Sequence, residues 1–176
     1  STQGGAVGAS VAFNALLGQQ NTARISGAKI RLAEGGMATV NAVNQGELNT
    51  VALNVAGSGG SVAFAGAAAV ADVQQNTTAE VVDADIESEQ ADNPAGDVTV
   101  QADGKLTART FAIVGSGSSE GAAIGAGVAV NLLDADTNAV ISGGKIHAAN
   151  VITDAKSDLD ILNIGMGVAA SSEGVA

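Results

Sequence analysis

The chain repeats itself three times, and this repetition restricts its fold more than any other feature. Three similar segments end at Ile30, Ile86 and Ile146, so the period is about 58 residues. Shorter matches support the alignment: Val11-Ala12-Phe13-Asn14 returns as Val128-Ala129-Val130-Asn131, and Gln19-Gln20-Asn21-Thr22 returns as Gln74-Gln75-Asn76-Thr77. Self-similarity at a fixed period of this order is typical of repeat architectures. We therefore interpret the chain as one solenoid with repeats at 1–58, 59–117 and 118–176.

The repeat boundary itself recurs. Ser118-Ser119-Glu120-Gly121 precedes the third repeat, and the same four residue types return at Ser171-Ser172-Glu173-Gly174. Solenoids normally carry polar capping elements at both ends, and the sequence shows no such pattern. We expect the chain to be a segment of a longer array.

Alternation of apolar and polar residues predicts β-strands within each repeat. Residues 97–103 place Val98, Val100 and Ala102 on one face, with polar residues between them. Residues 80–87 show the same period, with Val82, Ala84 and Ile86 expected inside. Helices are disfavoured because Gly and β-branched residues stand side by side.

The expected fold class is all-β, a parallel β-helix or β-solenoid with about three repeats of ~58 residues. Each repeat contains three blocks of roughly 20 residues, about the length of one coil of a three-sided β-helix. We therefore expect roughly three coils in each repeat. Nine coils spaced by ~4.8 Å would give a rod roughly 40 Å long.

Small residues dominate the apolar content, since 46% of the chain is hydrophobic but only 2% is aromatic. The Gly/Ala-rich block exemplified by Gly125–Asn131 has two interpretations. Small side chains let neighbouring backbones approach closely, which would make a thin face of the solenoid. Alternatively, the block forms a flat apolar face that packs against another chain. The thin face is the simpler interpretation.

Residues 87–96 interrupt the regularity. They contain the only proline and three acidic residues, and the other two repeats are shorter at this point. We expect a surface loop between coils. A tolerated insertion is the simpler interpretation, although loops on a rigid scaffold often carry binding residues.

Catalytic residues are not expected. His147 is the only histidine and there is no cysteine, so thiolate metal sites and disulfides are excluded. A Ser-His-Asp arrangement would require His147 at its centre. Its position after a Lys-Ile strand pattern predicts a solvent-facing side chain instead.

Paired carboxylates are the remaining candidates for chemistry. Asp83/Asp85, Asp134/Asp136 and Asp158/Asp160 are spaced i, i+2, which places each pair on one face of a strand. Calcium prefers such oxygen ligands, and Asp83, Asp85, Asp134 and Asp136 are its candidates. A polysaccharide-acting β-helix enzyme is a remote alternative. A solvated charged face is the simplest interpretation, so no cofactor is expected, with calcium as the alternative.

The net charge of −11 opposes binding to nucleic acid, which requires Lys and Arg against phosphates. It equally opposes binding to anionic lipid. The longest apolar stretch, near Gly121–Leu133, is shorter than the roughly 20 residues of a membrane-spanning helix. We expect neither nucleic-acid binding nor membrane insertion.

Three recurring motifs resemble the repeats of very large bacterial surface adhesins. The motifs are carried by Gly125–Asn131, Ala139–Ile146 and Gly96–Ala102. The family comprises filamentous-haemagglutinin-like and leukotoxin-like adhesins, including autotransporter passengers. The resemblance covers essentially the whole chain. It implies a right-handed parallel β-helix, export to the bacterial cell surface and no catalytic residues.

The expected function is therefore a non-catalytic structural or adhesive segment of an extracellular fibre or adhesin stalk. The alternative is a self-assembling subunit of an extracellular filament or matrix. Expected partners are other copies of the chain, packed end to end or laterally, or the surface of a host or neighbouring cell. Unpaired strands at the solenoid ends would favour end-to-end stacking.

Overall fold

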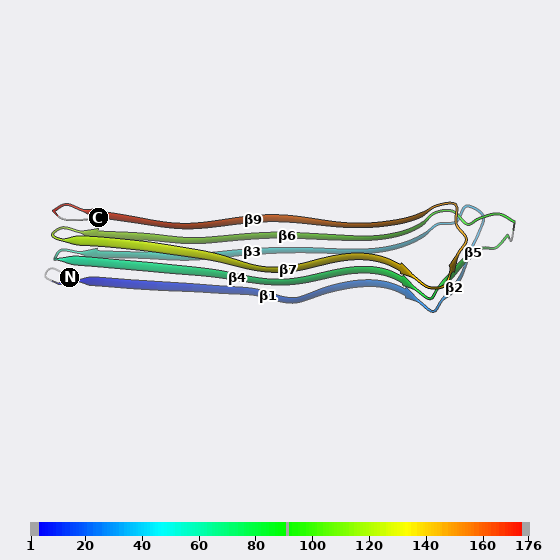
Figure 1. The fold of residues 1–176 in the computed structure, drawn as a ribbon, viewed down its shortest axis with the longest axis horizontal. Coiled ribbons are helices and arrows are strands. Elements are labelled where there is room, and N and C mark those ends of the chain that lie inside the picture. The colour runs from blue at the N-terminus through cyan, green and yellow to red at the C-terminus, as the bar shows by residue number, and fades with distance from the viewer. Residues whose placement is uncertain (1–3, 91, 174–176) are drawn as a thin grey trace.

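The computed structural model describes residues 4–90 and 92–173, and these residues form β-strands joined by turns (Figure 1). Each repeat contributes a long strand, a short strand and a second long strand. The first repeat forms β1 (Ala6–Ser26), β2 (Lys29–Leu32) and β3 (Ala38–Ser58). The second forms β4 (Val62–Val82), β5 (Asp85–Ser88) and β6 (Val98–Ser118). The third forms β7 (Ala122–Ser142), β8 (Lys145–Ile146) and β9 (Val151–Ser171).

Equivalent strands of the three repeats pair in parallel and form three sheets. Sheet 1 has the order β1-β4-β7, the corner sheet β2-β5-β8, and sheet 2 β3-β6-β9. Ile30 pairs with Ile86, and Ile86 pairs with Ile146. The predicted all-β parallel solenoid and the predicted equivalence of these three residues are confirmed.

The coil is larger than expected. Hydrogen-bonded neighbours are one whole repeat apart, as in the pairs Ala38–Val98 and Val62–Ala122. One repeat therefore makes one turn of the solenoid, and the expectation of roughly three coils per repeat is wrong. The physical reason is that the three blocks of a repeat pair with the next repeat and not with one another.

The long axis of the molecule follows the strands (Figure 1). Each long strand has 21 residues, which corresponds to roughly 70 Å. Three stacked strands span only about 10 Å from the first to the third. The result is a narrow, two-layered blade, and not the expected rod that extends along the solenoid axis. We call the end with the turns at 59–61 and 119–121 the turn end, and the opposite end the corner end.

The predicted alternation holds along the straight strands and fails at the corner. Val98, Val100 and Ala102 are buried, as are Ala84 and Ile86. Val82 is only half-buried, because its side chain lies on the outer face of β4 while its neighbour Val81 is buried. Asp83 has φ 51°, so the chain turns there and the phase of the alternation changes.

A β-bulge in β1 shifts the register by one residue. Leu16 pairs with Val73, but Gln19 pairs with Gln75, so Leu17 and Gly18 lie opposite a single residue of β4. Gly18 has φ +68°, a conformation that glycine adopts without strain. The aligned Gln-Gln-Asn-Thr motifs are consequently offset by one residue, whereas Val11, Ala68 and Val128 are in register as expected.

The connection after β5 is longer than its two counterparts. It runs from 89 to 97, whereas 33–37 and 147–150 make the equivalent connections. Figure 1 shows it projecting beyond the corner end, as expected for a surface loop. It remains tied to its neighbours: Ala95 forms a bridge with Ala148, and Gly96 N–H donates to the Gly36 carbonyl at 2.9 Å. Ala91 lies outside the described residues.

The side chains that fill the interior differ in size between the two ends of the blade. Near the corner end the core contains large side chains, including Val81, Ile86 and Val100. Towards the turn end it consists almost entirely of alanine, with Val114 as the one large buried member. The two halves therefore bury very different amounts of apolar surface between the sheets.

Inward-facing glycines explain the small core of the turn-end half. A Cβ atom on Gly127 would lie 2.5 Å from the Ala112 carbonyl oxygen and 2.8 Å from that of Met166. A Cβ on Gly167 would lie 2.3 Å from the Gly125 carbonyl oxygen. The backbones of sheets 1 and 2 are thus nearly in contact, which confirms the interpretation of the Gly/Ala block as a thin face.

A serine ladder secures the turn end. Ser58, Ser118 and Ser171 are in register in sheet 2. Ser118 Oγ donates to the Gly60 carbonyl at 2.8 Å, and Ser171 Oγ donates to the Gly121 carbonyl at 2.6 Å. The recurring Ser-Ser-Glu-Gly motif therefore has a structural role, since its first serine ties each returning strand to the turn of the preceding coil.

Among residues 4–90 and 92–173, no helix has the length and hydropathy required to cross a bilayer.

Candidate functional site: two outer apolar patches

Large apolar side chains lie on the outer faces of the turn-end half. We define the sheet-1 patch by the exposed side chains of Val7, Val11, Phe13, Ile124, Val128 and Leu132. We define the sheet-2 patch by those of Val51, Leu53, Val55, Ile113, Met166 and Val168. Val7 and Val55 retain 82% and 84% of their accessible surface, so the blade itself does not cover these side chains. Exposed apolar patches of this extent mark interaction surfaces in soluble proteins.

Strand alternation creates the patches. In β1 the inward positions of this half are Ala6, Gly8 and Ser10, and the outward positions between them include Val7 and Val11. In β7 the inward Gly125 and Gly127 alternate with the outward Ile124 and Val128. The small side chains are therefore inside and the large ones outside, which is the reverse of an ordinary β-sandwich.

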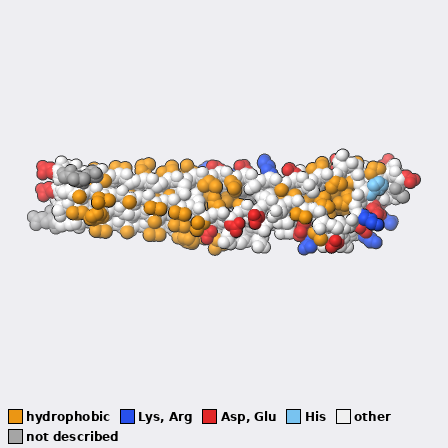
Figure 2. Space-filling model, in the orientation of Figure 1, with side chains coloured by type: hydrophobic (Ala, Val, Ile, Leu, Met, Phe, Trp, Pro, Cys, Tyr) orange, Lys and Arg blue, Asp and Glu red, His pale blue; other side chains and the backbone are white. Residues whose placement is uncertain are grey.

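The patches carry no charge. Residues 4–23, 48–71, 110–119, 121–133 and 161–172 contain no acidic, basic or histidine residue. Figure 2 shows hydrophobic side chains over the left half, with acidic side chains only at its far tip, and charged side chains of both signs from the middle to the right. Asp72 on sheet 1 and the Arg109–Asp160 ion pair on sheet 2, with an N–O distance of 3.3 Å, lie at the boundary.

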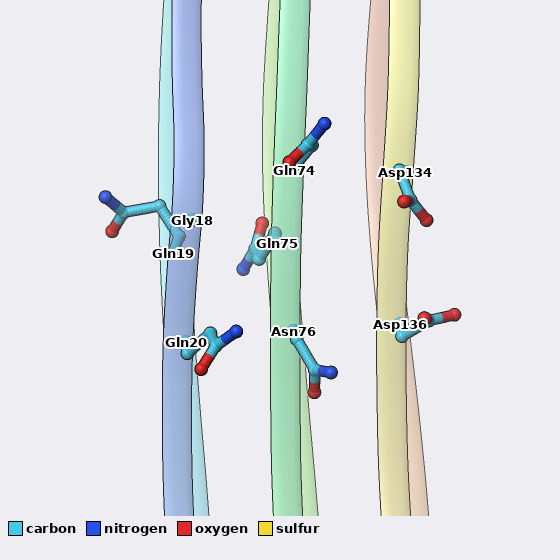
Figure 3. A pocket seen from close by; sticks show the side chains of 8 residues that line it. All are labelled: Gly18, Gln19, Gln20, Gln74, Gln75, Asn76, Asp134 and Asp136. Carbon is cyan, nitrogen blue, oxygen red and sulfur yellow. The ribbon is translucent and has the colours of Figure 1, made fainter.

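A shallow polar groove lies at mid-length on the outer face of sheet 1 (Figure 3). It has a volume of about 170 Å³ and is lined by glutamine, asparagine and aspartate side chains around the β1 bulge. The lining residues are Gly18, Gln19, Gln20, Gln74, Gln75, Asn76, Asp134 and Asp136. The bulge at Gly18 opens this groove because it displaces β1 locally from β4.

The structure places the Asp134/Asp136 pair in this groove. Both side chains are exposed on the outer face of β7, as the i, i+2 spacing predicts. Gln74 and Asn76 are their in-register partners on β4. The Asp136 side chain extends away from Asn76 in Figure 3, so the carboxylates and amides do not converge on one point.

The other carboxylate pairs lie elsewhere. Asp83 is in the turn between β4 and β5, and Asp85 is on β5, where its Oδ1 accepts a hydrogen bond from Lys145 N–H at 3.1 Å. Asp158 and Asp160 are exposed on β9 in sheet 2, where Asp160 pairs with Arg109. The four calcium candidates therefore occupy two separate places, the corner and the sheet-1 groove. Within the described part of the chain, no three Asp, Glu, His or Cys side chains form a metal-binding group.

His147 lies beside Arg31, Glu87, Ser88 and Glu89 in a shallow depression on the corner. Its backbone N–H donates to the Ile86 carbonyl at 2.9 Å, and its side chain is exposed, as predicted. The hydroxyl of Ser88 instead accepts a hydrogen bond from Gln90 N–H at 3.2 Å. The structure places this histidine in a charged surface at the corner.

Charged residues alternate in sign across the corner sheet. Lys29 pairs in register with Asp85, and Asp85 pairs with Lys145. On the same half of sheet 1, Arg24 Nε lies 3.2 Å from Glu80 Oε1, between two residues that are register partners. Opposite charges on neighbouring strands favour the observed register over a shifted one.

The sequence interpretation missed that the outward residues of the block form an exposed apolar surface. It identified the Gly/Ala-rich block but treated a thin face and an apolar outer face as alternatives. The structure shows that the inward residues of the block make the thin face, while the outward residues make the sheet-1 patch. The period-two pattern of Val7, Ala9, Val11 and Phe13 was the available signal.

Comparison of the chain with protein-family models, with characterised protein sequences and with solved structures finds no match.

Proposed function

We propose that this chain is a non-catalytic structural or adhesive segment of an extracellular fibre or adhesin on a bacterial cell. The observation that supports the proposal is the in-register stacking of the three repeats, in which each coil adds the same strands to the same two faces. Each further repeat would extend these faces without altering them, which suits a mechanical or surface role.

The coil geometry indicates what kind of structural part this is. One repeat of about 58 residues lengthens the stack by only ~4.8 Å, whereas its strands extend roughly 70 Å across the stack. Such a solenoid gains little reach per residue but exposes broad, flat faces. We therefore favour a role in which these faces make contacts over one in which the chain is simply a spacer.

Immunogold electron microscopy tests the proposal. Antibodies raised against the purified chain should label intact cells of the source bacterium, and brief protease treatment of intact cells should remove the label. Labelling that requires permeabilised cells would contradict an extracellular location. Antibodies against a cytoplasmic protein of the same cells provide the control.

The alternative is a self-assembling subunit of an extracellular filament or matrix. The observation that favours it is the presence of apolar patches on both outer faces of the same half, so that each blade can contact two neighbours. Negative-stain electron microscopy of the purified chain over a range of concentrations distinguishes an isolated blade from an assembled filament or sheet.

A further inference from the structure

The turn-end half of the blade has its large apolar side chains on the outside. Phe13 and Val128 on sheet 1 are 65% and 57% exposed, while Ala69 and Ala112 between the sheets are fully buried. The inward glycines leave no space for larger residues between the sheets, since a Cβ on Gly127 would meet backbone atoms. This half therefore buries little apolar surface by itself and retains much of it for a partner.

The dimensions of the patches match a protein interface. The patches belong to the uncharged turn-end halves of the two sheets, which have about eleven residues per strand, such as 48–58 on β3. Three neighbouring strands of this length cover about 36 Å by about 14 Å, or ~500 Å² of sheet surface. Two such faces packed together would bury about 1,000 Å², the lower limit for a specific interface. Because both outer faces of the blade carry a patch, each copy offers two surfaces of this size.

Lipid fits this surface poorly. β1 and β7 are the edge strands of sheet 1, and β3 and β9 are those of sheet 2. Their outward-facing backbone N–H and C=O groups in the turn-end half have no strand beside them among the described residues. In a bilayer each unsatisfied group would be strongly unfavourable, whereas at a face-to-face protein contact the edges remain hydrated. For the three-coil stack described, the patches therefore suit another sheet better than a bilayer.

The distribution of charge determines how two copies can face each other. All outward charged residues of sheet 1 lie from Asp72 towards the corner end, and they comprise one arginine and four carboxylates: Arg24, Asp72, Glu80, Asp134 and Asp136. Parallel stacking would place two acidic halves against each other, which is unfavourable. Antiparallel stacking overlaps the uncharged strand faces, with Glu120 and Glu173 in the turns beyond them. It points the acidic halves in opposite directions, beyond the ~8 Å screening length.

We propose that copies of this chain associate laterally, outer face on outer face, through the sheet-1 and sheet-2 patches, and that the sheet-1 contact is antiparallel and two-fold. Rows of small outward residues such as Ala9 and Gly66 accept the ridges formed by Val11 and Phe13 of the partner. The inference rests on the proposed structural role for its biological setting. It adds to that role that the partner is a second copy of the chain. Contacts through one patch give a dimer, and contacts through both give a laterally extended stack.

Sedimentation velocity and negative-stain microscopy of four chains test the proposal. The natural chain should form dimers and larger species as its concentration rises. Val11→Glu/Val128→Glu places charge in the sheet-1 patch, and Leu53→Glu/Val168→Glu does so in the sheet-2 patch. Each variant should stop at a dimer, and the combined variant should be monomeric, with the dissociation constant raised at least ~100-fold per face because like charges would be buried against each other.

The matched control is Thr22→Glu/Asn138→Glu, which adds the same charges to exposed outward positions of β1 and β7 in the polar half. It should associate as the natural chain does. Circular dichroism verifies that every variant keeps its β-structure, which is expected because the altered side chains are exposed.

Three results would overturn the proposal. The natural chain could remain monomeric at all concentrations. The combined variant could associate as the natural chain does, which would point to pairing of strand edges. The natural chain could be monomeric alone but float with phosphatidylcholine vesicles while the combined variant does not, which would identify lipid as the occupant. None of these results changes the immunogold labelling, so the proposed function and this inference fail separately.

Discussion

The two halves of the blade share the same strands, but they place their large apolar side chains on opposite faces of the sheets. In the corner-end half, Ile86 and Val100 are fully buried between the sheets and charged residues such as Lys105 face outward. In the turn-end half, alanine and glycine lie inside while Val7 and Val55 face outward. The corner-end half buries its large apolar side chains in its own core, whereas the turn-end half leaves them exposed, and we propose that a second copy covers them. The comparison shows that one uninterrupted strand can bury its large side chains along half of its length and expose them along the rest.

The largest expected effect comes from removing a core side chain in the corner-end half. Ile86→Ala should lower the free energy of unfolding by about 4 kcal/mol, because Ile86 is fully buried and its removal leaves a cavity. Val55→Ala, at an 84% exposed position of the other half, should change it by less than ~0.5 kcal/mol in dilute solution. Urea denaturation followed by circular dichroism measures both, and equal effects would contradict the division into halves.

A single methyl group tests the thin interior. Gly127→Ala should lower the free energy of unfolding by about 2–3 kcal/mol, because the added Cβ meets the carbonyl oxygens of Ala112 and Met166. Gly66→Ala is the matched control on the outer face of β4, where a Cβ meets no atom within 4 Å. Since alanine restricts the unfolded chain, Gly66→Ala should be neutral or slightly stabilising. Similar losses for both variants would show that the sheets are not in close contact.

Two threonines in the interior of sheet 2 are in register but differ in their hydrogen bonds. Thr50 Oγ1 is buried without a hydrogen-bond partner among the described residues, whereas Thr110 Oγ1 donates to Asn131 Oδ1. Thr50→Val should therefore stabilise the fold by up to ~1 kcal/mol, and Thr110→Val should destabilise it by about 1–2 kcal/mol. Thermal unfolding of both variants provides the measurement. The same direction of change for both would indicate that the two hydroxyls have equivalent surroundings.

The smallest expected effect concerns the polar surface of the corner-end half. Arg24→Gln removes the ion pair with Glu80, whose partners are partly exposed, and should cost no more than ~0.5 kcal/mol at low salt. The difference should vanish at high salt. Arg31→Gln, which breaks no ion pair among the described residues, is the control. A loss as large as that of Gly127→Ala that persists in high salt would show that this surface contributes to stability as much as the interior does.

Much of the fold could be predicted from the sequence. The alignment of Ile30, Ile86 and Ile146 gave the correct register of the corner sheet, because identical residues stack when repeats stack. The alternation around Val98–Ala102 gave the correct inner face. The register of Gln19 was predicted one residue away from its true partner, because a bulge adds a residue without altering the local motif.

The size of the coil could not be deduced from local pattern. A block of the observed length suits one coil of a three-sided β-helix, and it equally suits one long strand of a two-layered blade. Only hydrogen bonding between repeats distinguishes them, and these bonds connect residues a whole repeat apart, as between Ala38 and Val98. The sequence also placed the candidate carboxylates correctly on strand faces, except for Asp83, which lies in a turn. It could not predict that they lie in two separate places, because that depends on the path of the coil.

The sequence by itself determined the repeat, the strand period, the residues that share a face and the absence of charge from half of each strand. The tertiary structure decided which of the two faces is inside. Where polar and apolar residues alternate, as at Val98–Gln101, the apolar face is inside because the polar face remains in contact with water. The sequence pattern alone predicts this. Where Ile124, Gly125, Ala126 and Gly127 make both faces apolar, the choice depends on the distance between the sheets. The near contact of backbones at the glycines excludes the larger side chains from the interior and places them on the outer surface.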